Sequence, residues 1–228
     1  MKIPILYEDN HLLIIEKPVN IPVQEDRSKD EDLLNILKQD LKIRYNKPGN
    51  VYLGLLHRLD RPVGGAMVFA KTSKAASRMA DKIRKHEVSK QYLAVVRGEI
   101  KQQAGKWQDY LIKDHKNNQV RVAKKTEGKA KKAILDYHVL ATAKGLSLVK
   151  INLQTGRPHQ IRVQFASRGY PLYGDQKYGA KVNKVGQQIA LWSHQLAFDH
   201  PVKGEEIVQT CPSPNTYPWD MWDSDLFL

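Results

Sequence analysis

Short runs of apolar and β-branched residues recur along the chain, and they limit what it can fold into more than any other feature of the sequence. The runs cover residues 3–7, 11–17, 52–56, 66–70, 90–97, 133–140, 146–153, 189–198 and 207–210. Short turns such as Glu8-Asp9-Asn10 and Lys144-Gly145 join some of them, and strands joined in this way pair antiparallel. Because these runs outnumber the helical stretches, the sequence predicts an α+β fold with a mixed, mainly antiparallel central sheet and flanking helices.

Three stretches have the periodicity of helices that could cover such a sheet. The first follows a capping-box pattern of Ser28 and Glu31 and carries leucines on one face. The second covers residues 72–86. The third is predicted to begin at Pro158, because proline suits the first helical position, and to end before Gly169.

Composition indicates one intracellular domain. The chain has 228 residues, 41% of them hydrophobic, which suffices for the core of a single domain. Its one cysteine, Cys211, cannot form an intrachain disulfide. The N-terminal residues lack the continuous apolar stretch of a signal peptide, and no segment is long enough to span a bilayer. We therefore expect a cytoplasmic protein without a membrane partner.

The charge of the chain favours a polyanionic partner. Lys and Arg number 37 against 24 acidic residues, for a net charge of +13 and a pI near 9.7. Part of this excess gathers in what we call the basic stretch, which consists of Lys113, Lys116, Arg121, Lys124, Lys125, Lys129, Lys131 and Lys132. Net charge does not distinguish RNA from DNA or from an anionic membrane, and a run of charges is often only a solvated surface.

Several common sites are excluded by their missing signatures. The sequence has no GxxxxGK[ST] loop and no GxGxxG turn, so a nucleotide cofactor lacks its usual motif. The eight histidines do not cluster at metal spacing, and one cysteine cannot form a zinc ribbon. Gly64-Gly65 is interpreted as a flexible point only. The sequence therefore favours a reaction with neither cofactor nor metal.

The segment His57-Arg58-Leu59-Asp60-Arg61 places a carboxylate among cations, between two predicted strands. Cations nearby keep an aspartate ionised even in a partly enclosed site, and a nucleophilic carboxylate must be ionised. The alternative is a structural cluster of ion pairs that holds a loop. This segment alone does not decide between the two.

Two further segments have possible roles in binding RNA. Residues 155–162, Thr-Gly-Arg-Pro-His-Gln-Ile-Arg, combine a glycine turn, a predicted helix start and two arginines, which suits phosphate as well as an ordinary polar helix start. Residues 90–94, Lys-Gln-Tyr-Leu-Ala, place a tyrosine on a predicted strand. Its ring could stack on a displaced base, although most strand tyrosines pack in the core.

Together, and in this order, these segments resemble the RluA-type pseudouridine synthases, whose sequences carry HRLD, K-x-Y-x-A and G-R-x-H-Q-I-R. The resemblance extends through YEDNHLLIIEKP, FAKTSKAA and GYPLYGDQKYG, and so covers nearly the whole chain. It implies the pseudouridine synthase fold with a catalytic cleft. It also implies a cofactor-independent enzyme that detaches uracil from its ribose in RNA and reattaches it through carbon.

The resemblance assigns roles residue by residue. It makes Asp60 the catalytic aspartate, Tyr92 the residue that stacks on the target uracil, and Arg162 the partner of the aspartate. It makes Arg58 the residue that fills the space left by the flipped nucleotide. The substrate-binding residues expected from the two segments are His57, Arg58, Arg61, Arg157, His159, Gln160 and Ile161, with Ile161 as an apolar wall of the pocket.

The chain departs from the family pattern at a few places. Val63-Gly64-Gly65 stands where relatives usually have Thr or Val followed by Ser-Gly, and Asn20 stands where many have glycine. Many relatives carry a small RNA-binding domain before the catalytic one, and we expect none here. The expected architecture is a single catalytic domain over residues 1–228 that acts as a monomer. RNA selection would then come from its own surface, and the basic stretch is a candidate contact.

Two other functional classes are weighed against an enzyme. One is a non-catalytic RNA-binding or RNA-folding protein on the same scaffold, although binding alone does not need a nucleophile. The other is a DNA-binding regulator, for which the sequence has no helix-turn-helix or zinc pattern. The sequence does not decide whether the RNA is ribosomal RNA, transfer RNA or another RNA.

Overall fold

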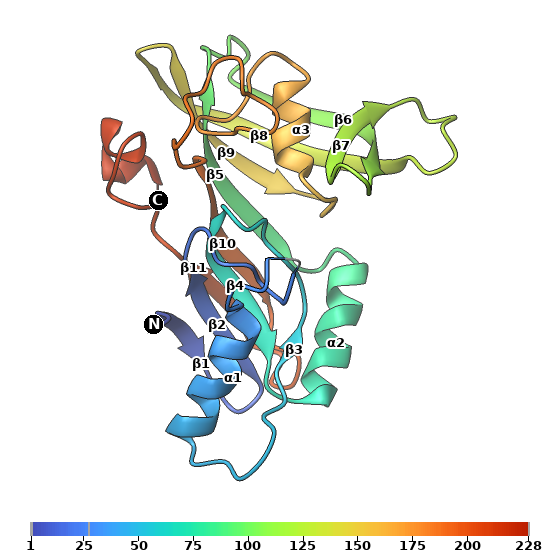
Figure 1. Cartoon of the computed structure of the whole chain (residues 1–228), viewed down its shortest axis with the longest axis vertical. Coiled ribbons are helices and arrows are strands. Elements are labelled where there is room, and N and C mark those ends of the chain that lie inside the picture. The colour runs from blue at the N-terminus through green and yellow to red at the C-terminus, as the bar shows by residue number, and fades with distance from the viewer. Residues whose placement is uncertain (1, 27, 228) are drawn as a thin grey trace. The chain divides into compact units, whose positions relative to one another are not determined.

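The computed structural model describes residues 2–26 and 28–227. The chain forms two compact units (Figure 1). Unit 1 consists of Met1–Ser89 and Ser193–Cys211, and unit 2 consists of Lys90–Trp192 and Pro212–Leu228. Each unit is built on antiparallel strand pairs with helices beside them, which confirms the predicted α+β class.

The sheet of unit 1 is built around two fully buried strands. Its strands are β1 (Ile5–Glu8), β2 (Leu12–Lys17), β3 (Gly54–Leu55), β4 (Gly64–Ala70), β11 (Glu206–Thr210) and the part of β10 (Leu191–Asp199) from Ser193 onward. They lie in the order β1-β2-β4-β10-β11, with β3 paired to β4. The helices are α1 (Leu33–Arg44) and α2 (Ser73–Arg84). All residues of β4 are buried, as are the first four of β2, so both faces of the sheet are covered there.

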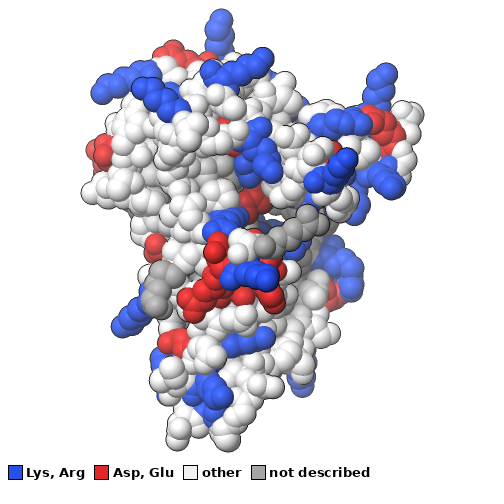
Figure 2. Space-filling model, in the orientation of Figure 1, with Lys and Arg blue, Asp and Glu red and all other residues white. Residues whose placement is uncertain are grey.

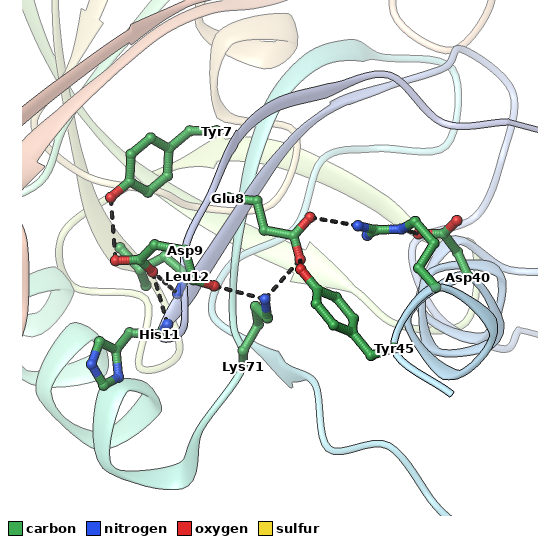
Figure 3. A network of polar contacts seen from close by, with 9 residues as sticks. Tyr7, Glu8, Asp9, His11, Leu12, Asp40, Tyr45 and Lys71 are labelled. Atoms are coloured by element: carbon green, nitrogen blue, oxygen red, sulfur yellow. Dashed lines mark hydrogen bonds and ion pairs between the residues drawn. The ribbon is translucent and has the colours of Figure 1, made fainter. Parts of the chain in front are cut away.

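A network of polar contacts ties the turn after β1 to its neighbours (Figure 3). The Glu8 carboxylate accepts hydrogen bonds from Lys71 Nζ at 2.7 Å, Arg44 Nη1 at 2.8 Å and the Tyr45 hydroxyl at 2.9 Å. These partners follow β4 or end α1. Asp9 closes the turn itself, because its Oδ1 accepts the backbone N–H groups two and three residues later. The network is structural, since each carboxylate is matched by donors from the scaffold.

The sheet of unit 2 is antiparallel throughout. Its strands are β5 (Ser89–Arg97), β6 (Ala104–Asp114), β7 (Gln119–Ala123), β8 (Lys131–Ala143) and β9 (Leu146–Leu153), in the order β5-β9-β8-β6-β7. Helix α3 (Gln160–Ala166) and the 3₁₀ helices η1 (Trp219–Met221) and η2 (Ser224–Phe227) complete it. The predicted hairpin turn is confirmed. Lys144 and Gly145 have φ of 51° and 71°, as a two-residue turn of this hand requires.

The predicted starts of the first and third helices are wrong. Helix α1 begins after Asp32, whose side chain accepts the N–H of Asn35 at 3.1 Å, so Ser28 does not cap it. The Ser28 hydroxyl instead donates to Asp26 at 2.6 Å. Helix α3 begins at Gln160, because His159 before it is left-handed with φ 50°. Among the residues described, no helix is long and apolar enough to cross a membrane.

Candidate active site

Asp60 lies in a tight turn that unit 1 anchors on both sides. Its carbonyl oxygen accepts the N–H of Val63 at 2.9 Å, which closes the turn between β3 and β4. The flanking residues Leu59 and Val63 are 8% and 2% exposed. The Asp60 side chain itself is half-buried. The fold therefore fixes the backbone beside the carboxylate while leaving part of the side chain accessible.

Lys17 binds the backbone of this turn, and the sequence predicted no role for it. Its side chain is fully buried, and Nζ donates to the carbonyl oxygens of Pro18 at 2.9 Å, Arg61 at 3.0 Å and Val63 at 2.8 Å. Three donors thus meet three acceptors. Burial lowers the pKa of Lys17 to about 7, although the nearby Asp60 charge raises it. Lys17 therefore holds the backbone that directly follows the predicted catalytic residue.

Arg61 and His57 make contacts that shape the loop. Arg61 donates through Nε to the Asn20 carbonyl at 3.0 Å, through Nη1 to the Ser28 hydroxyl at 3.1 Å, and through Nη2 to Asp30 at 2.5 Å. His57 Nε2 accepts the N–H of Val68 at 3.2 Å, within β4. Asn20 has φ 65°, which explains an asparagine at a position where relatives have glycine. The cations of this segment are therefore partly structural, as one interpretation of the sequence allowed.

The glycine pair after the turn is not a flexible point, contrary to expectation. Gly64 and Gly65 are buried in β4. Gly65 has φ 109°, and a Cβ there would lie 2.3 Å from the carbonyl oxygen of Ser193. Only glycine permits this approach of β4 to β10. The position that the family pattern keeps as glycine thus has a packing reason.

Arg58 and Tyr92 differ in exposure. Arg58 is exposed, whereas Tyr92 is 6% exposed on β5, opposite Ile151 of β9. Tyr92 shares its face of β5 with Ala94 and Val96, which are fully buried. The ring is therefore held rigidly by the sheet, as a stacking platform would need to be. Its role in stacking stays a prediction.

Arg162 is held by an acidic partner within unit 2. Its Nε and Nη2 each lie 2.8 Å from one carboxylate oxygen of Asp175, and the guanidinium carbon lies 5.2 Å from the centre of the Tyr178 ring. Arg162 is 6% and Asp175 is 1% exposed. Burial raises the pKa of Asp175, but the hydrogen bonds and charge of Arg162 outweigh it, so that pKa lies below its usual value. The pair fixes the plane of the guanidinium.

The sequence did not predict that Asp175 and Tyr178 contact Arg162 and His159, although the GYPLYGDQKYG segment that contains them resembles the family. Asp175 Oδ1 also accepts the N–H of Lys177 at 2.9 Å, and the Tyr178 hydroxyl lies 2.6 Å from His159 Nδ1. The same hydroxyl accepts the N–H of Val120 at 2.9 Å. These contacts link the segment to both the motif of Arg162 and strand β7.

The remaining predicted substrate-binding residues line the start of α3. Gln160, 3% exposed, accepts the N–H of Arg157 at 3.0 Å and donates to Ile134 O at 3.1 Å. Arg157 Nε donates to the carbonyl oxygen of Lys132 at 2.9 Å, and Ile161 is 4% exposed. Helix α3 has seven residues and starts two residues later than predicted, and phosphate binding by residues 155–162 stays a prediction.

The structure thus gathers two groups of predicted site residues. Residues 57–61 lie between β3 and β4 in unit 1, where Lys17 binds the carbonyl oxygen of Arg61, and residues 157–162 lie with Asp175 and Tyr178 in unit 2. The pairing of Asp60 with Arg162 stays a prediction. Within residues 2–26 and 28–227, no group of three or more His, Cys, Asp or Glu is placed to hold a metal ion.

Comparison with known proteins finds relatives whose similarity includes the candidate site residues 57–61, 90–94 and 155–162. A family model described as RNA pseudouridylate synthase matches residues 11–167. An uncharacterized RNA pseudouridine synthase of Aquifex aeolicus is 33% identical over 226 aligned positions, and the alignment covers 94% of this chain and 71% of that protein. The ribosomal large subunit pseudouridine synthase D of Pseudomonas aeruginosa is 33% identical over 233 aligned positions, and the alignment covers 96% of this chain and 71% of that protein. The synthase D of Zymomonas mobilis is 32% identical, with coverages of 89% and 67%.

Two solved structures share the fold. The human RNA pseudouridylate synthase domain containing 4 superposes with a TM-score of 0.78 at 24% identity, covering 92% of this chain and 88% of that one. The human RNA pseudouridylate synthase domain containing 1 gives a TM-score of 0.74 at 21% identity, with coverages of 96% and 86%. At this identity the likeness concerns the fold alone.

Proposed function

Because the chain belongs to the RNA pseudouridylate synthase family, in its RluA-type branch, we propose that it modifies large-subunit ribosomal RNA with Asp60 as the catalytic carboxylate. Its enzyme class is that of an RNA pseudouridine synthase, an isomerase that converts uridine in RNA to pseudouridine. The ribosomal substrate is supported by the similarity to two ribosomal large subunit pseudouridine synthases. Under this proposal, transfer RNA is not the substrate.

The observation that carries the role of Asp60 is its placement on a turn whose backbone is pinned by Lys17. A carboxylate that assists bond cleavage must keep its geometry while the substrate changes shape. The carbonyl oxygens of Arg61 and Val63, on the far side of the turn, both accept from one buried ammonium. The carboxylate of Asp60 is therefore carried by a rigid backbone, and its charge is attracted by the nearby ammonium of Lys17.

The reaction needs the target nucleotide outside the helix. Unstacking a uridine costs about a few kcal/mol, which phosphate contacts and stacking on Tyr92 would offset. Ionised Asp60 then assists cleavage of the bond between ribose C1′ and uracil N1. The freed uracil rotates, C5 bonds to C1′, the C5 proton leaves, and N1 gains a proton. Reactants and product are isomers, so no cofactor is consumed.

The other site residues receive roles consistent with their positions. We propose that Arg162, oriented by Asp175, pairs with Asp60 and keeps its carboxylate in place. The exposed Arg58 would fill the space that the flipped nucleotide leaves. Ile161 would form an apolar wall of the uracil pocket. We also propose that the protein acts in the cytoplasm as a monomer without a nucleotide cofactor.

An Asp60→Asn variant tests the central role. We expect release of the C5 hydrogen from RNA labelled at uridine C5 to fall by about three orders of magnitude or more, because the amide lacks the ionised oxygen. RNA affinity, measured by filter binding, should stay close to that of the wild type. Asp220→Asn, which changes an exposed carboxylate of η1, is the matched control. Equal turnover by the Asp60 variant would remove this residue from the mechanism.

The substrate is tested by mapping pseudouridine in RNA from cells with and without the gene. We expect at least one site in large-subunit ribosomal RNA to disappear and to return when purified wild-type protein is added. A site lost only from transfer RNA would refute the ribosomal assignment while leaving the enzyme class intact.

A further inference from the structure

Lys90 is a largely buried cation for which the enzyme mechanism has no use. It is the first residue of unit 2, on β5, and its side chain is only partly exposed. Burial lowers the pKa of its ammonium. In the parts of the chain that the structure describes, Nζ has no hydrogen bond and no ion pair. A cation withdrawn from water without a partner is costly, so an anion supplied from outside would be bound favourably.

The surroundings of Lys90 leave its ammonium open to a ligand. A Cβ added to Gly156 would lie 3.6 Å from Nζ, so the ammonium sits directly beside this glycine. Gly156 is exposed, and its backbone neither has positive φ nor meets a close contact that demands glycine. The missing side chain therefore leaves room at Nζ where a solvent-borne group can approach.

Lys90 lies two residues before Tyr92 on the same strand, β5. Alternate residues of a strand point to the same face and are spaced by about 6.6 Å, so both side chains leave β5 on one side. Within one nucleotide, base and phosphate are separated by a comparable distance. A nucleotide whose base lies on Tyr92 can therefore bring a phosphate to Lys90.

We propose that Lys90, beside Gly156, binds a backbone phosphate of the RNA next to the nucleotide that stacks on Tyr92. The proposal builds on the proposed function, because it takes Tyr92 as the stacking residue. Lys90 is then a substrate-binding residue that helps to hold the extruded nucleotide. A single phosphodiester satisfies it, since an ammonium pairs with one anion as a point charge.

The test compares Lys90→Met and Lys90→Arg with Lys101→Met, which alters an exposed lysine of the same unit. RNA affinity is measured from about 50 to 200 mM salt. Loss of one phosphate contact should reduce the slope of log K against log salt by about 0.7 to 0.9. We expect Lys90→Met to show this loss with about tenfold weaker binding at low salt. Lys90→Arg should keep the slope, and Lys101→Met should match the wild type.

A second variant tests the same site without removing the lysine. Gly156→Asp places a carboxylate beside Nζ, where it would occupy the position assigned to the phosphate. We expect RNA binding as weak as in Lys90→Met, together with a higher melting temperature because the buried cation gains a partner. Unchanged RNA affinity in this variant would contradict the proposal.

The outcomes separate this inference from the proposed function. If the wild type releases the C5 hydrogen but Lys90→Met keeps the wild-type salt slope, the phosphate site is refuted and the enzyme stands. If the slope falls but Asp60→Asn turns over normally, the phosphate site stands and the mechanism is refuted. A Lys90→Met protein that is less stable than the wild type would indicate a structural lysine and would also refute the site.

Discussion

Lys17 and Lys90 are lysines that the fold withdraws from solvent, one in each unit, yet their surroundings differ. Burial lowers the pKa of both ammonium groups, that of Lys17 to about 7. Lys17 donates to three carbonyl oxygens, whereas Lys90, within the described residues, has neither a hydrogen bond nor an ion pair. Burial alone therefore does not distinguish the two lysines. Their partners do: a buried lysine with three acceptors stabilises the local backbone, whereas one without a partner is available to bind an anionic ligand.

The largest effect is expected from Lys17→Met. The substitution leaves three carbonyl oxygens without their donor, one in a buried hydrogen bond and two in partly buried ones, and a buried group of this kind costs about 1 to 3 kcal/mol. We expect the free energy of unfolding to fall by about 4 kcal/mol, with a loss of turnover because the Asp60 turn loosens. Urea denaturation followed by circular dichroism measures the first, and C5-hydrogen release measures the second.

Lys90→Met is the matched control for this comparison, because it makes the same chemical change at another buried lysine. Its free energy of unfolding should equal or exceed that of the wild type, since no partner is lost. If both variants were destabilised equally, the distinction between the two lysines would be wrong.

Asp175→Asn extends the comparison to a buried cation in unit 2 that has an anionic partner. The change removes the negative charge that faces Arg162 at two points, both at 2.8 Å. We expect a loss of about 3 kcal/mol at neutral pH, because the buried guanidinium loses the negative charge of Asp175, the carboxylate that orients it. Denaturation at pH 7 measures it, with Asp220→Asn as an exposed control.

The pH dependence distinguishes this ion pair from mere packing. The pKa of Asp175 in the folded protein lies below its ordinary value of 3.8, so the carboxylate stabilises the fold fully above that value. This stability is lost as the pH falls through the lower, folded-state pKa. The difference between wild type and Asp175→Asn should therefore be constant from about pH 5 to 8 and shrink in stronger acid. A difference independent of pH down to the lowest pH at which both fold would indicate that the charge is not the cause.

The sequence predicted the elements whose local signals are strong and missed those that depend on distant contacts. The turn at Lys144-Gly145 could be predicted, because few residue pairs accept positive φ at two successive positions. The hairpin of β6 and β7 was not predicted because half of its strand residues are exposed and several are charged, so apolar alternation is weak. No spacing rule indicates that Asp175, 13 residues beyond Arg162, would be its partner. Likewise, nothing local shows that the ammonium of Lys17 reaches carbonyls 44 and 46 residues away.

The smallest effect on RNA binding is expected from the basic stretch, because its side chains are exposed whereas that of Lys90 is partly buried. All eight are exposed, and Figure 2 shows Lys and Arg side chains gathered over the region of β6 and β7. Arg121 is already paired with Glu127 at 2.5 Å, which leaves the lysines as the candidates for RNA. We expect Lys124→Gln with Lys125→Gln to weaken RNA binding only a few-fold at low salt and to leave turnover at saturating RNA unchanged.

The salt dependence of the same double variant decides whether these lysines touch RNA at all. If they contact phosphates, the slope of log K against log salt should flatten, by less than about 0.9 per lysine because solvated side chains hold each phosphate only part of the time. If they form only a solvated surface, the slope stays that of the wild type. A loss per lysine larger than that of Lys90→Met would reverse the ranking, because it would mean that exposed cations bind RNA more firmly than the partly buried one.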